Sequence, residues 1–260
     1  MMPTPVSSRI GATAAVVFLV VPLVALLMRV PWLRVPEILV DPAVSGALGL
    51  SLRTAVVSTM IAALLGVPCA WWLAARTGPL REAVRVVVSV PLVLPPVVAG
   101  VALLYALGRG SFLGDVLSHA GVSIAYTTSA VVLAQTFVAL PFIITTVDAA
   151  LTAHGHRGEE VAATLGFTPR RAFFLITLPT IRPALLTALA LGFARALGEF
   201  GATLTVAGAI AGRTQTLPVA INALLGYDID AALTAAALML VIACLILGLL
   251  RTPALTGGVR

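Results

Sequence analysis

The stretch EVAATLGFTPRRAFFLITLP, residues 160–179, lies in the longest polar segment of a chain that is otherwise dominated by apolar runs. Glu159, just before the stretch, and Glu160 at its start favour a helix, and Gly166 stands where that helix would end in a left-handed residue. Thr168 followed by Pro169 is typical of the N-cap and first position of a second helix, and Pro179 is expected to stop it. The stretch therefore predicts a compact elbow of two short helices joined at a glycine.

The runs on both sides of this elbow are long and apolar. The chain has 260 residues, of which 60% are hydrophobic and 10% charged, whereas a soluble domain carries roughly a quarter charged residues. About 20 apolar residues cross a bilayer, and six runs approach or exceed that length: 10–28, 50–75, 86–107, 127–147, 183–208 and 231–250. We therefore predict an all-α polytopic membrane protein in which residues 1–260 form one membrane domain, with the first run retained as an anchor.

The arginines indicate how six such spans would be oriented. Residues 148–182 form the longest connecting loop, which then lies on the same side as both termini. Ten of the 16 basic residues fall on that side, and four fall on the other: Arg29, Arg34, Arg109 and Arg213. Because cytoplasmic loops carry the excess of positive charge, we expect the 148–182 loop and both termini to be cytoplasmic.

All 16 basic residues are arginines, and the absence of lysine excludes several chemistries. A P-loop needs a lysine on the phosphates, and Schiff-base catalysis needs a lysine amine. No spacing typical of a catalytic triad, a metalloprotease helix or a dinucleotide-binding loop occurs. The net charge of +6 is not concentrated in a basic tract, which argues against nucleic-acid binding. We expect a chain that is not an enzyme and holds no metal or cofactor of its own.

The apolar residues of the elbow need a surface to pack on. Val161, Leu165, Phe173 and Phe174 would otherwise be exposed in a polar loop. One interpretation is an amphipathic segment that rests on lipid headgroups. The other is a docking element for a cytoplasmic partner protein, because a short elbow attached to spans at both ends can transmit a displacement.

The spacing within the elbow favours the docking element. The pattern E-x-A, three residues, G, nine residues, I-x-L-P is formed by Glu160, Ala162, Gly166, Ile176, Leu178 and Pro179. It resembles the EAA loop of ABC-importer permeases, with Val161 in place of the first alanine. The resemblance implies a type I importer (MetI-like) fold with six spans, functioning as a homodimer. Its 148–182 loop would be a coupling element docked on a separate ATP-binding subunit, two copies of which would carry ATP and Mg²⁺.

The same resemblance assigns parts to the motif residues. Glu160 and its neighbours would lie at the boundary with the ATP-binding subunit, and Gly166 would form the bend. The last three motif residues, Ile176, Leu178 and Pro179, would fix the elbow to the membrane core.

Three further stretches narrow the resemblance. PLVLPPVVAGVALLY at 91–105, VLAQTFVALP at 132–141 and FARALGEFGATLT at 193–205 look like the permeases of molybdate importers. This implies a permease in a prokaryotic cell membrane that receives molybdate from an extracytoplasmic binding protein. Sulfate and tungstate permeases share much of the outline and stay as alternatives. An ion-coupled secondary transporter, with Arg195 and Glu199 binding the substrate, is a more distant one.

Polar and helix-breaking residues inside the spans are candidates for the translocation path. Arg195 and Glu199 are four residues apart on one helix face, so they either pair with each other or line the path of an oxyanion. Small or polar neighbours in the same run and a proline pair in the third run extend this candidate set: Gly198, Gly201, Thr203, Pro95 and Pro96. The glycines allow close helix approach, and the prolines indicate either a kink or a gate.

Overall fold

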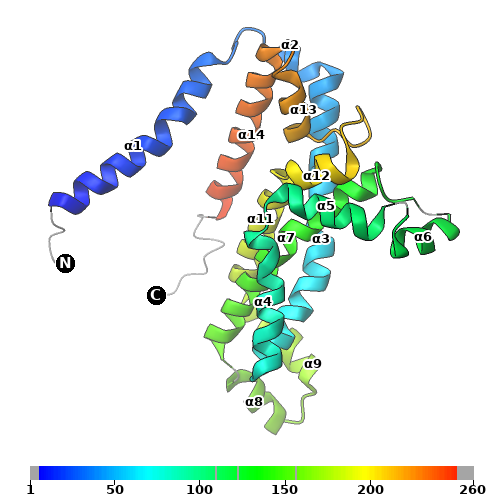
Figure 1. The fold of residues 1–260 in the computed structure, drawn as a ribbon. Coiled ribbons are helices and arrows are strands. Elements are labelled where there is room, and N and C mark those ends of the chain that lie inside the picture. The colour runs from blue at the N-terminus through cyan, green and yellow to red at the C-terminus, as the bar shows by residue number, and fades with distance from the viewer. Residues whose placement is uncertain (1–5, 109, 122, 156, 251–260) are drawn as a thin grey trace.

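The computed structural model describes residues 6–108, 110–121, 123–155 and 157–250, and no β-strand occurs within these ranges (Figure 1). The long helices are α1 (Val6–Arg29), α3 (Pro42–Ala74), α7 (Thr128–His154) and α14 (Ile229–Leu250). The shorter helices are α2 (Val35–Val40), α4 (Pro79–Val93), α5 (Pro96–Leu107), α6 (Phe112–His119), α8 (Arg157–Thr164), α9 (Pro169–Ala172), α10 (Leu178–Thr180), α11 (Arg182–Leu197), α12 (Gly201–Ala207) and α13 (Leu217–Leu224). A π-helical turn, Phe173–Thr177, joins α9 to α10. The prediction of an all-α protein is confirmed for this part of the chain.

Within the described ranges, four helices are long and apolar enough to cross a membrane: α1, α3, α7 and α14. Two bent pairs pass the same test, α4 with α5 at 114° and the stretch Pro169–Thr180 with α11 at 77°. Counting each bent pair as one span gives up to six. The presence of several spanning helices is thus confirmed, and the count of six stays a prediction.

Two of the six predicted runs are broken inside: the prolines indicated the kink in 86–107, whereas 183–208 was predicted as one continuous run. The run 86–107 divides at Leu94, whose ψ of 131° is extended, because a proline disfavours a helical residue before it and brings no N–H. The run 183–208 divides between α11 and α12 at residues 198–200. There Glu199 accepts a hydrogen bond from the backbone N–H of Ala202 at 2.8 Å, which starts a new helix in place of continuing the old one.

The second run also differs from its predicted start. Helix α3 begins at Pro42, eight residues before the apolar run, since Asp41 accepts a hydrogen bond from the N–H of Ala43 at 2.7 Å. An aspartate N-cap followed by a proline at the first helical position is a strong start signal. The added turns carry α3 towards the end of the molecule that holds α2 and α13 (Figure 1).

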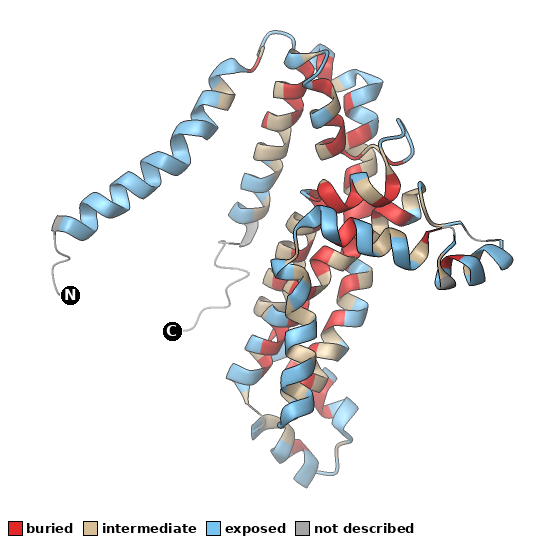
Figure 2. Ribbon diagram, in the orientation of Figure 1, coloured by how far each residue is buried: buried red, intermediate tan, exposed pale blue. Residues whose placement is uncertain are grey.

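Helix α7 is the centre of the core. In the most apolar 18-residue stretch of α7, 61% of the residues are buried, compared with 0% in that of α1. Figure 2 shows α1 almost entirely exposed beside a buried central group. Small residues bring the neighbouring helices close to α7. A Cβ atom on Gly66 of α3 would lie 3.2 Å from Ile143, and one on Gly192 of α11 would lie 2.9 Å from the same side chain. The absence of a side chain at these glycines lets α3 and α11 lie directly against α7.

The two ends of the helix group differ in content. Helices α8 and α9 form one end, while α2 and α13 lie at the other (Figure 1). At this second end Ile38, Val44, Leu217 and Ala235 form a smaller core that joins α2, α3, α13 and α14. Between the two ends, α5 and α12 run across the group and α6 projects to the side (Figure 1).

Candidate functional site

The elbow has the geometry that its local signals predict. Helix α8 ends at Thr164, and Gly166 has a φ of +82°, a left-handed conformation that favours glycine. Thr168 then accepts a hydrogen bond from the N–H of Arg171 at 3.4 Å, with Pro169 at the first helical position. The predicted helix, glycine bend and second helix are therefore confirmed.

The end of the elbow differs from the prediction, because Pro179 does not stop the second helix. The chain stays helical from Pro169 to Thr180 and bends by 77° before α11. Pro179 lies in α10, directly after the π-helical turn Phe173–Thr177. The bend falls at Ile181, which leaves the helical conformation with a ψ of 4°.

One contact holds the elbow to the rest of the chain and a second joins its two arms, and neither was predicted. Phe173 is buried and stacks on Trp71 of α3, with ring centroids 4.3 Å apart. Thr177, 3% exposed, donates a hydrogen bond to Oε1 of Glu159 on α8 at 2.7 Å. These two residues are 18 positions apart in the sequence, and only the fold of the elbow brings them together. The result is an elbow whose two arms are tied to each other and to the core.

The motif residues divide between the inner and outer faces of the elbow. Ala162 is buried, and Ile176 and Leu178 are half-buried, which agrees with attachment to the core. Glu160, Gly166 and Pro179 are exposed. Three of the four apolar elbow residues also stay exposed, by 57% at Val161, 71% at Leu165 and 62% at Phe174. We define the elbow tip as these three apolar residues. It stays mostly exposed in the described part of the chain, where Phe174 makes an edge contact with Phe173 at 5.4 Å between ring centroids.

Arg195 and Glu199 form the ion pair that their spacing allows. Arg195 Nη1 lies 2.7 Å from Glu199 Oε2, where the arginine side chain is 29% exposed and the glutamate 1%. Helix α11 ends at Leu197 between them, so the pair crosses the break. Since the second carboxylate oxygen of Glu199 accepts the N–H of Ala202, one side chain joins α11 to α12.

Helices α5 and α12 cross at very close range beside this pair. A Cβ atom on Gly201 would lie 3.0 Å from Cβ of Pro96, and one on Gly100 would lie 2.6 Å from Cβ of Thr205. Pro95 precedes α5 as its N-cap residue, and Thr203 is fully buried on α12. Of the predicted path residues, the structure thus brings Pro96 and Gly201 together and leaves Gly198 exposed outside this crossing.

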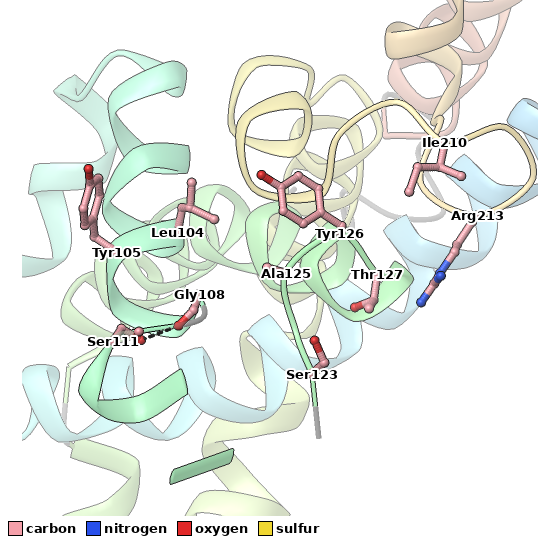
Figure 3. A pocket seen from close by; sticks show the side chains of 11 residues that line it. Leu104, Tyr105, Gly108, Ser111, Ser123, Ala125, Tyr126, Thr127, Ile210 and Arg213 are labelled. Atoms are coloured by element: carbon pink, nitrogen blue, oxygen red, sulfur yellow. Dashed lines mark hydrogen bonds between the residues drawn. The ribbon is translucent and has the colours of Figure 1, made fainter. Parts of the chain in front are cut away.

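A cavity of about 710 Å³ lies next to the crossing and was not predicted (Figure 3). Its lining comes from the end of α5, the start of α6 and the loops before α7 and α13: Leu104, Tyr105, Gly108, Gly110, Ser111, Ser123, Ala125, Tyr126, Thr127, Ile210 and Arg213. Ser111 and Thr127 are the N-cap residues of α6 and α7. No local motif marks this site, because its residues come from separate segments.

Sequence comparison identifies the relatives of the chain. A family model described as "Binding-protein-dependent transport system inner membrane component" matches residues 62–252. The molybdenum transport system permease protein ModB of Mycobacterium tuberculosis is 47% identical over 235 residues, covering 90% of this chain and 89% of the relative. The sulfate transport system permease protein CysT of Escherichia coli is 33% identical over 233 residues, covering 88% and 84%.

Solved structures share the fold. An ABC importer of the acidic polysaccharide alginate aligns with a TM-score of 0.70 at 18% identity, covering 94% of this chain and 93% of that chain. The methionine transporter MetNI, in an inward-facing conformation, aligns with a TM-score of 0.63 at 20% identity, covering 82% and 95%. The family model and the relatives each cover most of the chain, and the chain therefore belongs to the inner membrane components of binding-protein-dependent transport systems.

Proposed function

We propose that this chain is the permease subunit of an ATP-driven importer of molybdate. The observation that supports molybdate as the substrate is the 47% identity to the molybdenum permeases, compared with 33% identity to the sulfate permease over a similar length. A sulfate or tungstate importer of the same architecture is the alternative, because tetrahedral oxyanions differ little in size. The chain itself is not an enzyme in this proposal.

The working assembly that we propose contains two copies of this chain, two ATP-binding subunits and an extracytoplasmic molybdate-binding protein. Family membership supports the binding protein and the ATPase partner. ATP and Mg²⁺ belong to the ATPase partner, and this chain holds no cofactor. The assembly lies in a prokaryotic cell membrane, surrounded by lipid, with the 148–182 loop and both termini in the cytoplasm.

The elbow is the coupling element of this assembly. Its tip exposes Val161, Leu165 and Phe174 next to Glu160, and an apolar group beside a charged residue is typical of a protein–protein contact. Movement of the tip reaches the spans through the stack of Phe173 on α3 and through buried Ile181 at the start of α11. A displaced ATP-binding subunit would therefore move the elbow and the core helices together.

The translocation path runs, in this proposal, beside the broken helices α5, α11 and α12. Pro95, Pro96, Arg195, Gly198, Glu199, Gly201 and Thr203 are the candidate residues. Broken helices at membrane depth are tolerated where they line a cavity or pack within protein, and the Thr203 hydroxyl is buried with no hydrogen-bond partner among the described residues. Arg195 either gives the path positive potential or serves only to hold Glu199.

Reconstitution with the ATPase and binding protein in proteoliposomes tests the substrate. ATP hydrolysis and uptake are compared with molybdate, tungstate and sulfate, each presented by the same binding protein. We expect molybdate to stimulate both, while a matched assembly with a hydrolysis-deficient ATPase takes up none. Stimulation by sulfate alone would overturn the substrate, and undiminished uptake driven by an ion gradient without ATP would support a secondary transporter.

A further inference from the structure

The cavity beside the α5–α12 crossing has polar groups suited to an anion. Among the described residues Arg213 is its one charged lining residue, and hydroxyl groups come from Ser111, Ser123, Tyr126 and Thr127 (Figure 3). The nearby carboxylate of Asp115 is not part of the lining, and it accepts a hydrogen bond from the N–H of Gly110 at 3.1 Å. The hydroxyls of Ser111 and Thr127 already donate to backbone carbonyl oxygens as helix caps. Among the described residues, the lining therefore offers one cation and the hydroxyls of Ser123 and Tyr126, and it holds no carboxylate.

The guanidinium of Arg213 is available to a ligand. Arg213 is exposed, and within the described ranges no carboxylate forms an ion pair with it, whereas Arg34, Arg85 and Arg195 each have one. An unpaired arginine presents a planar fork of N–H groups that matches two oxygens of one anion. This distinguishes Arg213 from the structural arginines of the chain.

The backbone around the cavity is held in place. The hydroxyl of Thr128 at the start of α7 donates to the carbonyl oxygen of Arg213 at 2.8 Å, and fully buried Thr214 accepts the N–H of Ile210 at 2.9 Å. Tyr126 has a φ of +61°, which costs energy for a residue with a side chain. Its N–H donates to the carbonyl oxygen of Val206 at 3.2 Å, and this bond fixes the strained turn against α12.

We propose that this cavity is a weak binding site for a tetrahedral oxyanion, at which the transported anion first contacts the permease. Arg213 supplies the charge, and the hydroxyl of Ser123 supplies a further donor (Figure 3). The caps Ser111 and Thr127 set the starts of α6 and α7 at the lining, so both helix dipoles add positive potential. Anion binding rests on this geometry alone, and the identification of the anion as cargo rests on the proposed function.

Charge-selective thiol labelling tests the site without relying on transport. The assembled transporter is prepared with Cys69→Ser and Cys244→Ser, and Ser123→Cys places one thiol in the lining. An anionic sulfonate and a cationic ammonium methanethiosulfonate are compared, with 2-mercaptoethanol as the reference thiol. We expect the anionic reagent to be favoured about fivefold over the reference ratio, because a single cation acts on the two reagents with opposite sign. Changes in thiol reactivity affect both reagents and cancel in the ratio.

Arg213→Gln should remove this preference, while Arg29→Gln, which removes an exposed arginine outside the lining, should preserve it. A preference that survives in Arg213→Gln would overturn the proposal. In phospholipid-free detergent, added molybdate should slow the labelling of the Ser123→Cys thiol several-fold. If phosphatidylglycerol nanodiscs slow the labelling of this thiol and molybdate does not, the site does not bind the transported anion. The anion that it binds would then be a lipid headgroup. If the selectivity and protection hold but the wild-type assembly imports no molybdate, the proposed function fails and the anion site stands.

Discussion

The elbow tip and the cavity beside Arg213 leave opposite kinds of side chain uncovered. The elbow tip presents Val161, Leu165 and Phe174 on a loop that is tied to the core, whereas the cavity presents Arg213 and hydroxyl groups. Exposed apolar groups gain most from exclusion of water by another protein, while an exposed guanidinium is suited to an ion that arrives from water. The difference predicts a protein partner at one site and a small anion at the other.

The largest effect is expected from Leu165→Asp at the elbow tip. Leu165 is 71% exposed, so the change should not affect folding of the permease. A charge in the centre of a docking surface should reduce uptake about 30-fold and weaken co-purification of the ATPase subunit. Leu80→Asp is the matched control, since Leu80 is 62% exposed at the start of α4 and lies outside the elbow. Equal losses in the two variants would refute the docking role of the tip.

Breaking the ion pair between α11 and α12 should have the next largest effect. Glu199→Ala removes both the partner of Arg195 and the acceptor for the Ala202 N–H, and we expect a loss of about 2–3 kcal/mol of stability. Glu199→Gln keeps an acceptor and should lose less. Thermal unfolding of the purified permease in detergent measures both. An unchanged melting temperature in Glu199→Ala would show that the pair does not hold the break together.

Arg195→Gln in the same pair separates a path role from a structural one. If Arg195 gives the path positive potential, uptake should fall several-fold at unchanged assembly and binding-protein-stimulated ATP hydrolysis. If it only holds Glu199, uptake should follow the loss of thermal stability. Normal uptake by a fully assembled complex would exclude Arg195 from the path.

The elbow could be predicted from sequence because its signals are local. The bend at Gly166 and the cap at Thr168 depend on the residues beside them, and both are confirmed. Pro179 was misplaced as a stop because the position of a proline within a turn decides whether it breaks a helix. Whether the motif residues contact an ATPase stays a prediction.

The break inside 183–208 and the cavity were not predicted, whereas the prolines did indicate the kink in 86–107. Apolar residues dominate 183–208, and the break appears only where Glu199 accepts the N–H of Ala202. The cavity lining joins Ser111, Thr127 and Arg213 from separate segments, so no spacing in the sequence encodes it. An arginine without a partner can be recognised only after the ion pairs of the other arginines are known.

The hydrogen bond from Thr177 to Glu159 braces the two arms of the elbow, and its removal tests coupling with a smaller expected effect. Thr177→Val keeps the shape of the side chain but removes the hydrogen bond to Glu159, at about 1 kcal/mol. We expect ATP hydrolysis to continue while uptake per ATP falls two- to threefold, because a looser elbow transmits less movement. Thr180→Val is the control, since exposed Thr180 bonds only the carbonyl of Ile176 within its own turn. A fall in hydrolysis and uptake by the same factor would indicate lost docking and contradict a bracing role.

The smallest effect is expected from the equivalent brace at the cavity. Thr128→Val removes the hydrogen bond from the Thr128 hydroxyl to the carbonyl oxygen of Arg213. This bond is exposed, whereas Thr177 is 3% exposed, and water can replace a lost partner only at the exposed site. We therefore expect less than about 0.5 kcal/mol and a melting temperature within error of wild type, with a modest loss of charge selectivity at the Ser123→Cys thiol. A larger thermal effect for Thr128→Val than for Thr177→Val would show that the loop carrying Arg213 is a structural element of the permease. The hydroxyl of Thr128 would then stabilise the fold and would not serve to position the guanidinium of Arg213.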